Sequence, residues 1–242
     1  MRRPWERHSE VCAKVIIATK VGNQWRPDGS GWDWNPSKAY ILQAAEASLH
    51  RLQTDYIDLY QLHGGTIDDP MDETIEAFEL LKEQGKIRYY GISSIRPNVI
   101  RKYIKRSDIT SVMLQYSLLD RRPEETVLDQ LQQHQIGVLA RGSLAQGLLA
   151  GKPAKDYLGY TSEQVRQAAE AVQGVAGTKR KLAEVAVRYV LHHPVVSSAV
   201  LGIRTKEQLE DALAAASSVA LSQQEMQTLR ELLPPNRYTE HR

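Results

Sequence analysis

The sequence predicts an α/β protein built on a parallel sheet, and two observations support this prediction. Six short apolar segments alternate along the chain with segments of helical spacing, which is the order expected when helices join parallel strands. The chain has 242 residues, 42% of them hydrophobic, which suits one barrel-sized domain or two small ones and is enough for a large core. The alternation agrees equally well with an open, doubly wound sheet and with an incomplete eight-stranded barrel.

The predicted strands are short apolar runs that lead into a glycine, a polar residue or a turn. They cover residues 15–21, 57–63, 89–94, 111–119, 136–140 and 197–201. Lys20 lies near the end of the first strand and His63 closes the second. In a parallel barrel the working residues lie at the C-terminal ends of the strands. We therefore expect Lys20 and His63 to share a site.

Apolar residues at helical spacing predict that the segments between these strands are helices. Ser37 is a favourable N-cap for the first helix, which runs to Leu52. Gly85 ends the second helix, Pro97 begins the third and Pro123-Glu124-Glu125 begins the fourth. The remaining predicted helices cover residues 162–193, divided near Gly174 and Gly177, then 206–216 and 222–233.

Two segments have no predicted helix or strand. Residues 1–13 are polar and show no apolar periodicity. Residues 23–36 are expected to form a loop, and they hold Trp25, Trp32 and Trp34. Such a loop is either a lid or an aromatic wall of a pocket, and the sequence favours neither. No change in composition marks a domain boundary, so residues 1–242 are expected to form a single domain.

Composition argues against several classes of protein. A net charge of +2 offers no reason to expect nucleic acid or an anionic membrane as a partner. Cys12 is the single cysteine, so neither an intrachain disulfide nor a cysteine-based zinc site can form, which fits a reducing cytosol. No secretory signal and no apolar run of membrane-spanning length is found. We therefore expect a cytoplasmic protein.

Single residues in this sequence carry little functional information without their context. A lysine after a strand is usually solvated, and a histidine at a strand end is usually a structural hydrogen bonder. Residues 147–152 resemble a phosphate-binding P-loop superficially, but Gly151 comes one residue early and Pro153 replaces the serine or threonine. His192-His193 before Pro194 is expected to be a helix end and not a metal site.

Five motifs taken together resemble the successive strand ends of the aldo-keto reductases. These motifs are VIIATKV (15–21), DYIDLYQLH (55–63), GISS (91–94), QYSLL (115–119) and RGSLAQGLL (141–149). The resemblance runs from about residue 14 to residue 216. It implies a (β/α)8 TIM-barrel fold and the reduction of aldehydes or ketones with NADPH, the carbonyl compound being the small-molecule partner. Six βα units and a C-terminal helix would be present, so the barrel is expected to be incomplete.

The resemblance also implies roles for particular residues. Lys20 and His63 correspond to the catalytic lysine and histidine of the family. The residues implied in binding the nicotinamide part of the cofactor are Ser93, Ser94, Gln115 and Arg141. Those implied at the pyrophosphate are Gly142, Ser143, Leu144 and Gln146, and those at the 2′-phosphate and adenine are Arg204, Thr205 and Gln208. No metal is implied.

The sequence departs from the family pattern at three places. Met113 stands where a nicotinamide-binding glutamine is common, and Ala212 stands where an asparagine usually meets the adenine. Nothing before Val15 matches the first two βα units, which carry the catalytic Asp and Tyr. We therefore expect impaired reduction by this chain, or alternatively a non-catalytic nucleotide-binding or interaction protein, as among the potassium-channel β-subunit relatives. Open barrel edges would also favour self-association.

Overall fold

The computed structural model describes residues 15–242, and these residues form two compact units. The first unit runs to Val112 and includes His241, and the second runs from Met113 to Glu240 and includes Arg242. The expectations for residues 1–13, and those based on Cys12, lie outside the described part of the chain. Assignment of residues 1–242 to a single domain stays a prediction.

The sheet of the first unit consists of parallel neighbours in chain order. Strand β1 (Ala18–Val21) pairs with β4 (Ile57–His63), which pairs with β5 (Ile87–Ser93). The second strand is present with its predicted bounds, whereas β1 begins three residues later than expected and β5 begins two residues earlier. The register places Lys20 beside Gln61 and His63 beside Ser93.

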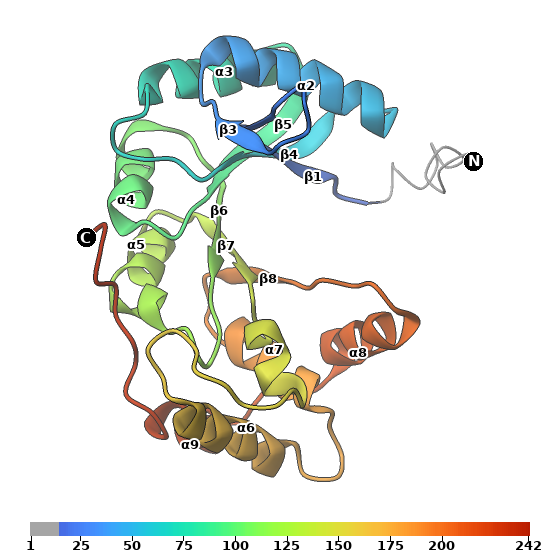
Figure 1. Ribbon diagram of the computed structural model, residues 1–242, viewed down its shortest axis with the longest axis vertical. Helices are drawn as coiled ribbons and strands as arrows, with labels where there is room; N and C mark the ends of the chain where they lie inside the picture. The colour runs from blue at the N-terminus through green and yellow to red at the C-terminus, as the bar shows by residue number, and fades with distance from the viewer. Residues whose placement is uncertain (1–14) are drawn as a thin grey trace. The chain divides into compact units, whose positions relative to one another are not determined.

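Helices of the first unit cover the face of its sheet on which Tyr60 and Tyr90 lie. These helices are α2 (Lys38–Leu52), α3 (Met71–Glu83) and α4 (Pro97–Arg106) (Figure 1). The ring of Phe78 on α3 lies 5.7 Å from that of Tyr60 and 5.2 Å from that of Tyr90, measured between centroids. Because side chains alternate between the two faces of a strand, Gln61 and His63 project from the opposite face.

The expectation of a loop at residues 23–36 is wrong, because this segment forms an antiparallel hairpin. Strand β2 (Asn23–Trp25) pairs with β3 (Trp32–Trp34) (Figure 1). Arg26 and Asp33 form a bidentate ion pair across it, and Arg26 N donates to the carbonyl of Gly31 at 2.9 Å. The strands are only three residues long, so they contain no apolar alternation that sequence analysis could detect.

The fourth predicted strand is shorter than expected. Strand β6 ends at Gln115 (Ser111–Gln115), because Ser117 and Asp120 exchange backbone hydrogen bonds and turn the chain. The following helix also begins differently from the prediction. A 3₁₀ turn, η2 (Arg122–Glu125), precedes α5 (Val127–Gln133), and Thr126 between them has a non-helical backbone.

The second unit combines a parallel strand pair with helices. Strand β7 (Gly137–Arg141) pairs with β8 (Val196–Val200), with Arg141 beside Val200. The other elements are η3 (Ala145–Ala150), α6 (Ser162–Ala176), α7 (Leu182–Leu191), α8 (Lys206–Ser217) and α9 (Gln223–Glu231). The predicted helical region therefore divides after Ala176, whereas Gly174 lies inside α6. All six predicted strands occur among residues 15–242.

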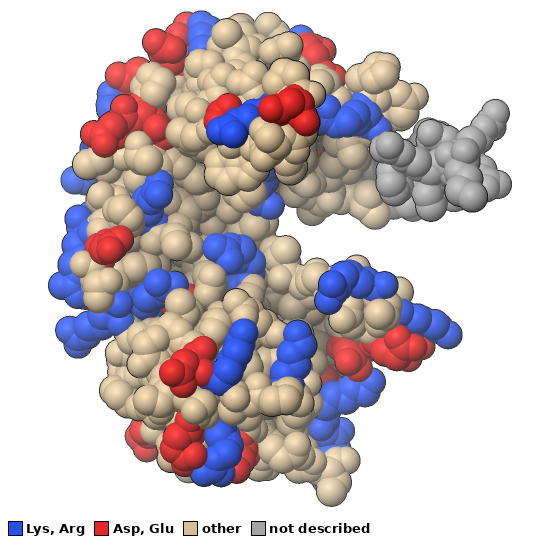
Figure 2. Space-filling view, viewed as in Figure 1, with Lys and Arg blue, Asp and Glu red and all other residues tan. Residues whose placement is uncertain are grey.

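Charged side chains of both signs are spread over the visible surface of each unit (Figure 2). Many of them pair locally, as Arg166 does with Glu163 and Glu170 on α6, and such exposed pairs contribute little to stability. None of the helices within residues 15–242 is long and apolar enough to cross a membrane. Over the same residues, no cluster of three or more His, Cys, Asp or Glu could hold a metal ion.

Candidate active site

In the first unit, the predicted catalytic residues lie at the C-terminal ends of adjacent strands. Lys20 is beside Gln61 in the β1–β4 register, and His63 is beside Ser93 in the β4–β5 register. Residues paired across a parallel ladder project to the same face of the sheet, so all these side chains share the face opposite the helices. Ser93 and Ser94 are buried, with 8% and 6% of their surfaces exposed.

Tyr60 on β4 and Tyr56 just before this strand do not belong to this cluster. Tyr60 points to the helical face, where its ring packs against Phe78. Burial raises the pKa of the Tyr60 hydroxyl above its ordinary value, which makes it a poor proton donor. Tyr56 precedes the strand and lies under the guanidinium of Arg88, which is 3.9 Å from the ring centroid. Neither tyrosine therefore replaces the family's catalytic acid.

The tryptophan hairpin contacts the loop that follows His63. The indole Nε1 of Trp34 donates to Asp69 Oδ1 at 3.0 Å. Its ring lies over two glycines, so that a Cβ atom built on Gly22 would come within 2.3 Å of the ring and one on Gly64 within 3.6 Å. Trp34 therefore packs beside the strand ends, whereas the side chains of Trp25 and Trp32 are exposed.

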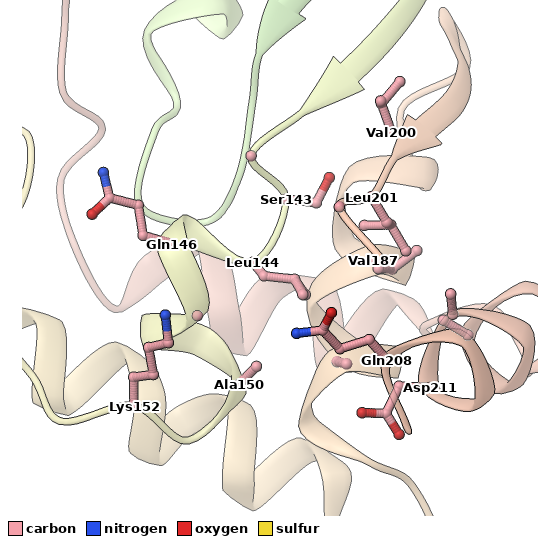
Figure 3. A pocket seen from close by; sticks show the side chains of 16 residues that line it. Ser143, Leu144, Gln146, Ala150, Lys152, Val187, Val200, Leu201, Gln208 and Asp211 are labelled. Atoms are coloured by element: carbon pink, nitrogen blue, oxygen red, sulfur yellow. The ribbon is translucent and has the colours of Figure 1, made fainter. Parts of the chain in front are cut away.

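In the second unit, the predicted cofactor residues surround a cavity of about 420 Å³. This volume is within the roughly 300–1,000 Å³ typical of small-molecule sites. One wall is the loop from Gly142 to Gly147, and another is one side of α8 (Figure 3). Predicted residues on the cavity wall are Gly142, Ser143, Leu144, Gln146 and Gln208.

Gln115 and Arg141 lie together near this loop. Arg141 Nη1 donates to Gln115 Oε1 at 3.0 Å, and Gln115 Nε2 donates to the hydroxyl of Tyr157 at 3.0 Å. Gly142 follows in the left-handed backbone region, with φ of +72°, and a Cβ atom there would lie 3.2 Å from Gln115 Cγ. Burial raises the pKa of Tyr157 above its ordinary value. Arg141 is therefore held in place by a chain of polar contacts.

Arg204, Thr205 and Gln208 lie together at the start of α8. Thr205 is the N-cap, and its hydroxyl accepts from Gln208 N at 3.3 Å. The side-chain oxygen of Gln208 accepts from Arg204 N at 2.7 Å. Arg204 and Thr205 are exposed and are not part of the cavity wall, whereas Gln208 is. A helix N-terminus with an exposed guanidinium beside it is suited to an anion.

Sequence analysis missed Lys152, which lies on the cavity wall (Figure 3). Its side chain packs so closely on Gly147 that a Cβ atom there would come within 2.8 Å of Lys152 Cδ. Tyr157 was missed as well, although it contacts Gln115. Residues 147–152 do not form a P-loop motif, yet the position of Lys152, a cation three residues after the matched motif 141–149, is a signal that could have indicated its place.

Comparison with known proteins identifies the family. The family model described as the aldo/keto reductase family matches residues 7–234. The chain belongs to the aldo/keto reductase family. The uncharacterized oxidoreductase YqkF of Bacillus subtilis is 49% identical to this family member over 94% of the chain and 77% of the relative. An NADH-specific methylglyoxal reductase of Escherichia coli is 33% identical over 60% of the chain and 48% of that relative.

Solved aldo-keto reductase structures share the fold. The holo form of AKR11C1 from Bacillus halodurans is 49% identical, with a TM-score of 0.88 over 95% of this chain and 76% of that one. The prediction of an α/β fold of aldo-keto reductase type is therefore confirmed. Family membership also agrees with the order of the five sequence motifs, which lie within the matched residues.

Proposed function

We propose that this aldo-keto reductase reduces aldehydes or ketones to alcohols with NADPH. The observation that carries the proposal is the cavity of the second unit, which lies between the Gly142–Gly147 loop and α8. Its walls offer backbone donors of a glycine-containing loop, the side chain of Lys152 and Gln208 at the start of a helix. Such donors and positive charge suit a phosphorylated nucleotide, and the cavity has the size of a small-molecule site.

The residues of the first unit would act on the carbonyl group. When bound, the nicotinamide supplies the hydride, and the protein supplies orientation and electrostatic stabilisation. His63, exposed at the end of β4, would donate a hydrogen bond to the carbonyl oxygen. Lys20 at the end of β1 would add positive charge on the same face of the sheet. Ser93 and Ser94 would bind the nicotinamide amide.

The choice of NADPH rests on Arg204. This exposed guanidinium lies beside the N-cap of α8, where a 2′-phosphate would meet both its charge and the helix N-terminus. The alternative is a preference for NADH, which lacks this phosphate. It is suggested by the relative from Escherichia coli that is named as NADH-specific. A binding measurement with both cofactors separates these two outcomes.

The first prediction is that Arg204→Ala weakens NADPH binding more than NADH binding. Loss of one charge-assisted contact to a phosphate removes about 1.5–3 kcal/mol, so we expect a Kd for NADPH about 10- to 100-fold higher. The Kd for NADH should change little, because that cofactor lacks the 2′-phosphate. Titration of cofactor fluorescence measures both constants on the same preparation.

Lys179→Ala is the matched control, because it removes one exposed cation of the second unit that lies between α6 and α7 and not at the start of α8. This variant should leave both constants unchanged. An equal loss of affinity for the two cofactors in Arg204→Ala would show that Arg204 does not read the 2′-phosphate. Tighter binding of NADH than of NADPH by the unaltered chain would contradict the cofactor choice itself.

We further propose that this chain is a weak catalyst in the cytosol. Residues 15–242 supply six strands of the parallel sheet, and the family resemblance assigns neither the catalytic Asp nor the catalytic Tyr to a residue of these strands. Loss of a general acid typically slows a reaction by about 10²–10⁴-fold. The alternative is a nucleotide-binding protein without catalysis, for which cofactor would bind with normal affinity and no carbonyl compound would be reduced.

A further inference from the structure

We propose that Asn23 is a positioning residue that holds the proton of neutral His63 on Nε2. The side-chain Nδ2 of Asn23 lies 3.4 Å from His63 Nδ1. An amide nitrogen can only donate, so the Nδ1 atom that faces it accepts and carries no proton. The ring proton is then on Nε2. The catalytic meaning of this contact rests on the proposed function, but the contact itself does not.

The length of this contact is consistent with such a role. A separation of 3.4 Å is at the long end for a hydrogen bond, and His63 is exposed. Hydrogen bonds of catalytic groups are often long before substrate binds and shorten in the complex. Asn23 and His63 are 40 residues apart in the sequence, so the amide that contacts the His63 ring comes from the hairpin and not from the strand of His63.

Asn23 is itself held from two sides. The hydroxyl of Tyr40 on α2 donates to the backbone carbonyl of Asn23 at 3.1 Å. In the hairpin, Asn23 pairs with Trp34, and Asn35 N donates to the carbonyl of Gly22 at 2.7 Å. The backbone of Asn23 therefore has a defined position between α2 and the second hairpin strand, which is needed if its amide is to orient another side chain.

The hairpin is also attached to the loop that follows His63. Trp34 donates through its indole to Asp69, and Asp69 accepts from Thr66 N at 2.7 Å. The ring of Trp34 lies against Gly64, the residue after His63. Asn23 and His63 thus belong to two segments that are joined by a second, independent contact. These contacts favour a fixed position of the amide opposite the imidazole.

This arrangement has a direct chemical consequence. With the proton on Nε2, the imidazole offers a donor on the side away from Asn23, where a carbonyl oxygen of a substrate could accept it. With the proton on Nδ1, Nε2 would offer a lone pair and would repel that oxygen. Asn23 therefore selects the form of His63 that can stabilise negative charge on the substrate.

The test is the protonation of the His63 ring in the 242-residue chain, read by long-range ¹H–¹⁵N correlation at a pH where the imidazole is neutral. His63→Gln identifies the signals of His63 among those of the other histidines. We expect Nε2–H as the dominant tautomer in the unaltered chain. Asn23→Asp replaces the donor by a carboxylate that can only accept, so the dominant tautomer should become Nδ1–H. Asn23→Ala should give a mixture of both.

Asn35→Asp is the matched control. It introduces the same charge next to the same hairpin, but the amide of Asn35 donates to Gln24 Oε1 at 2.7 Å and does not touch His63. The His63 tautomer should not change in this variant. A dominant Nδ1–H form in the unaltered chain, or a tautomer that is the same in the unaltered chain and in both Asn23 variants, would overturn the proposal. Because no substrate is used, these outcomes do not depend on whether the chain reduces carbonyls.

Discussion

At the residue scale, the contacts of single side chains determine which substitutions the strand ends tolerate. Gly22 has a φ of +125°, and a Cβ atom on it would come within 2.3 Å of the Trp34 ring. Gly29 in the hairpin turn has a φ of +73°, and no atom lies within 4 Å of its Cβ position. Both glycines have a positive φ, which other residues rarely adopt. The two positions differ because the Trp34 ring lies against Gly22 and not against Gly29.

The second prediction compares alanine at these two positions. Gly22→Ala should lower the free energy of unfolding by about 1–3 kcal/mol more than Gly29→Ala does, because only at residue 22 must an aromatic ring move. Urea denaturation followed by circular dichroism measures both values. The Gly29 variant controls for the backbone strain of a positive φ. Equal losses in the two variants would mean that the Trp34 ring relaxes without cost.

At the scale of elements, four helices of the described residues, α2, α6, α8 and α9, begin where a hydroxyl side chain caps them. Ser37, Thr161, Thr205 and Ser222 each accept from the backbone N–H of the third residue after them. All four of these starts were expected within one residue, since an N-cap is a local signal. Strand bounds at β1, β5 and β6 were less well predicted. They depend on hydrogen bonds to other strands, which residue types do not specify.

The third prediction concerns the start of α6. Thr161 and Gln164 form a reciprocal capping box there. Thr161→Ala should lower the free energy of unfolding by about 1 kcal/mol, because the backbone N–H of Gln164 loses its acceptor. Thr161→Ser keeps the hydroxyl and should retain most of that stability. Denaturant titration of the two variants makes the comparison, and an unchanged midpoint for Thr161→Ala would show that solvent replaces the cap.

At the scale of the whole molecule, two strands have a single neighbour among the described residues. Strand β1 pairs with β4 alone, and β8 pairs with β7 alone. Next to β1, Ile16 has 81% of its surface exposed, and Val200 at the end of β8 has 38% exposed. Unpaired strand edges with exposed apolar residues favour pairing with further strands. The edges of each unit are therefore candidate sites of self-association.

The fourth prediction is that residues 1–242, expressed alone, associate with copies of themselves and reduce carbonyls slowly. Light scattering measures the mass in solution as a function of concentration, and oxidation of NADPH with a reactive aldehyde measures turnover. Replacing Ile16 by Lys should reduce association, because charged residues protect strand edges, while Ile67→Lys, at an exposed apolar residue away from the strand edges, is the control.

Two results would contradict this prediction. A mass equal to one chain at all concentrations would show that the edges do not associate. Turnover within the ordinary range for enzymes, about 1–10³ per second, would show that a residue of these 242 donates the proton. Tyr157 is a buried hydroxyl that contacts Gln115 in the second unit, and Tyr157→Phe would then test whether it is that donor.

The sequence by itself determined the family, the chain order of six strands and most helix starts. These features are local, because a strand end, a cap or a motif such as DYIDLYQLH is formed by neighbouring residues. Only the tertiary structure decided which distant side chains meet. Trp34 reaches Asp69 across 35 residues, and Asn23 reaches His63 across 40. Lys152 lines the cavity for the same reason. Folding places η3, Lys152 and α8 around one cavity. Such contacts depend on the path of the whole backbone, which no local pattern of residue types records.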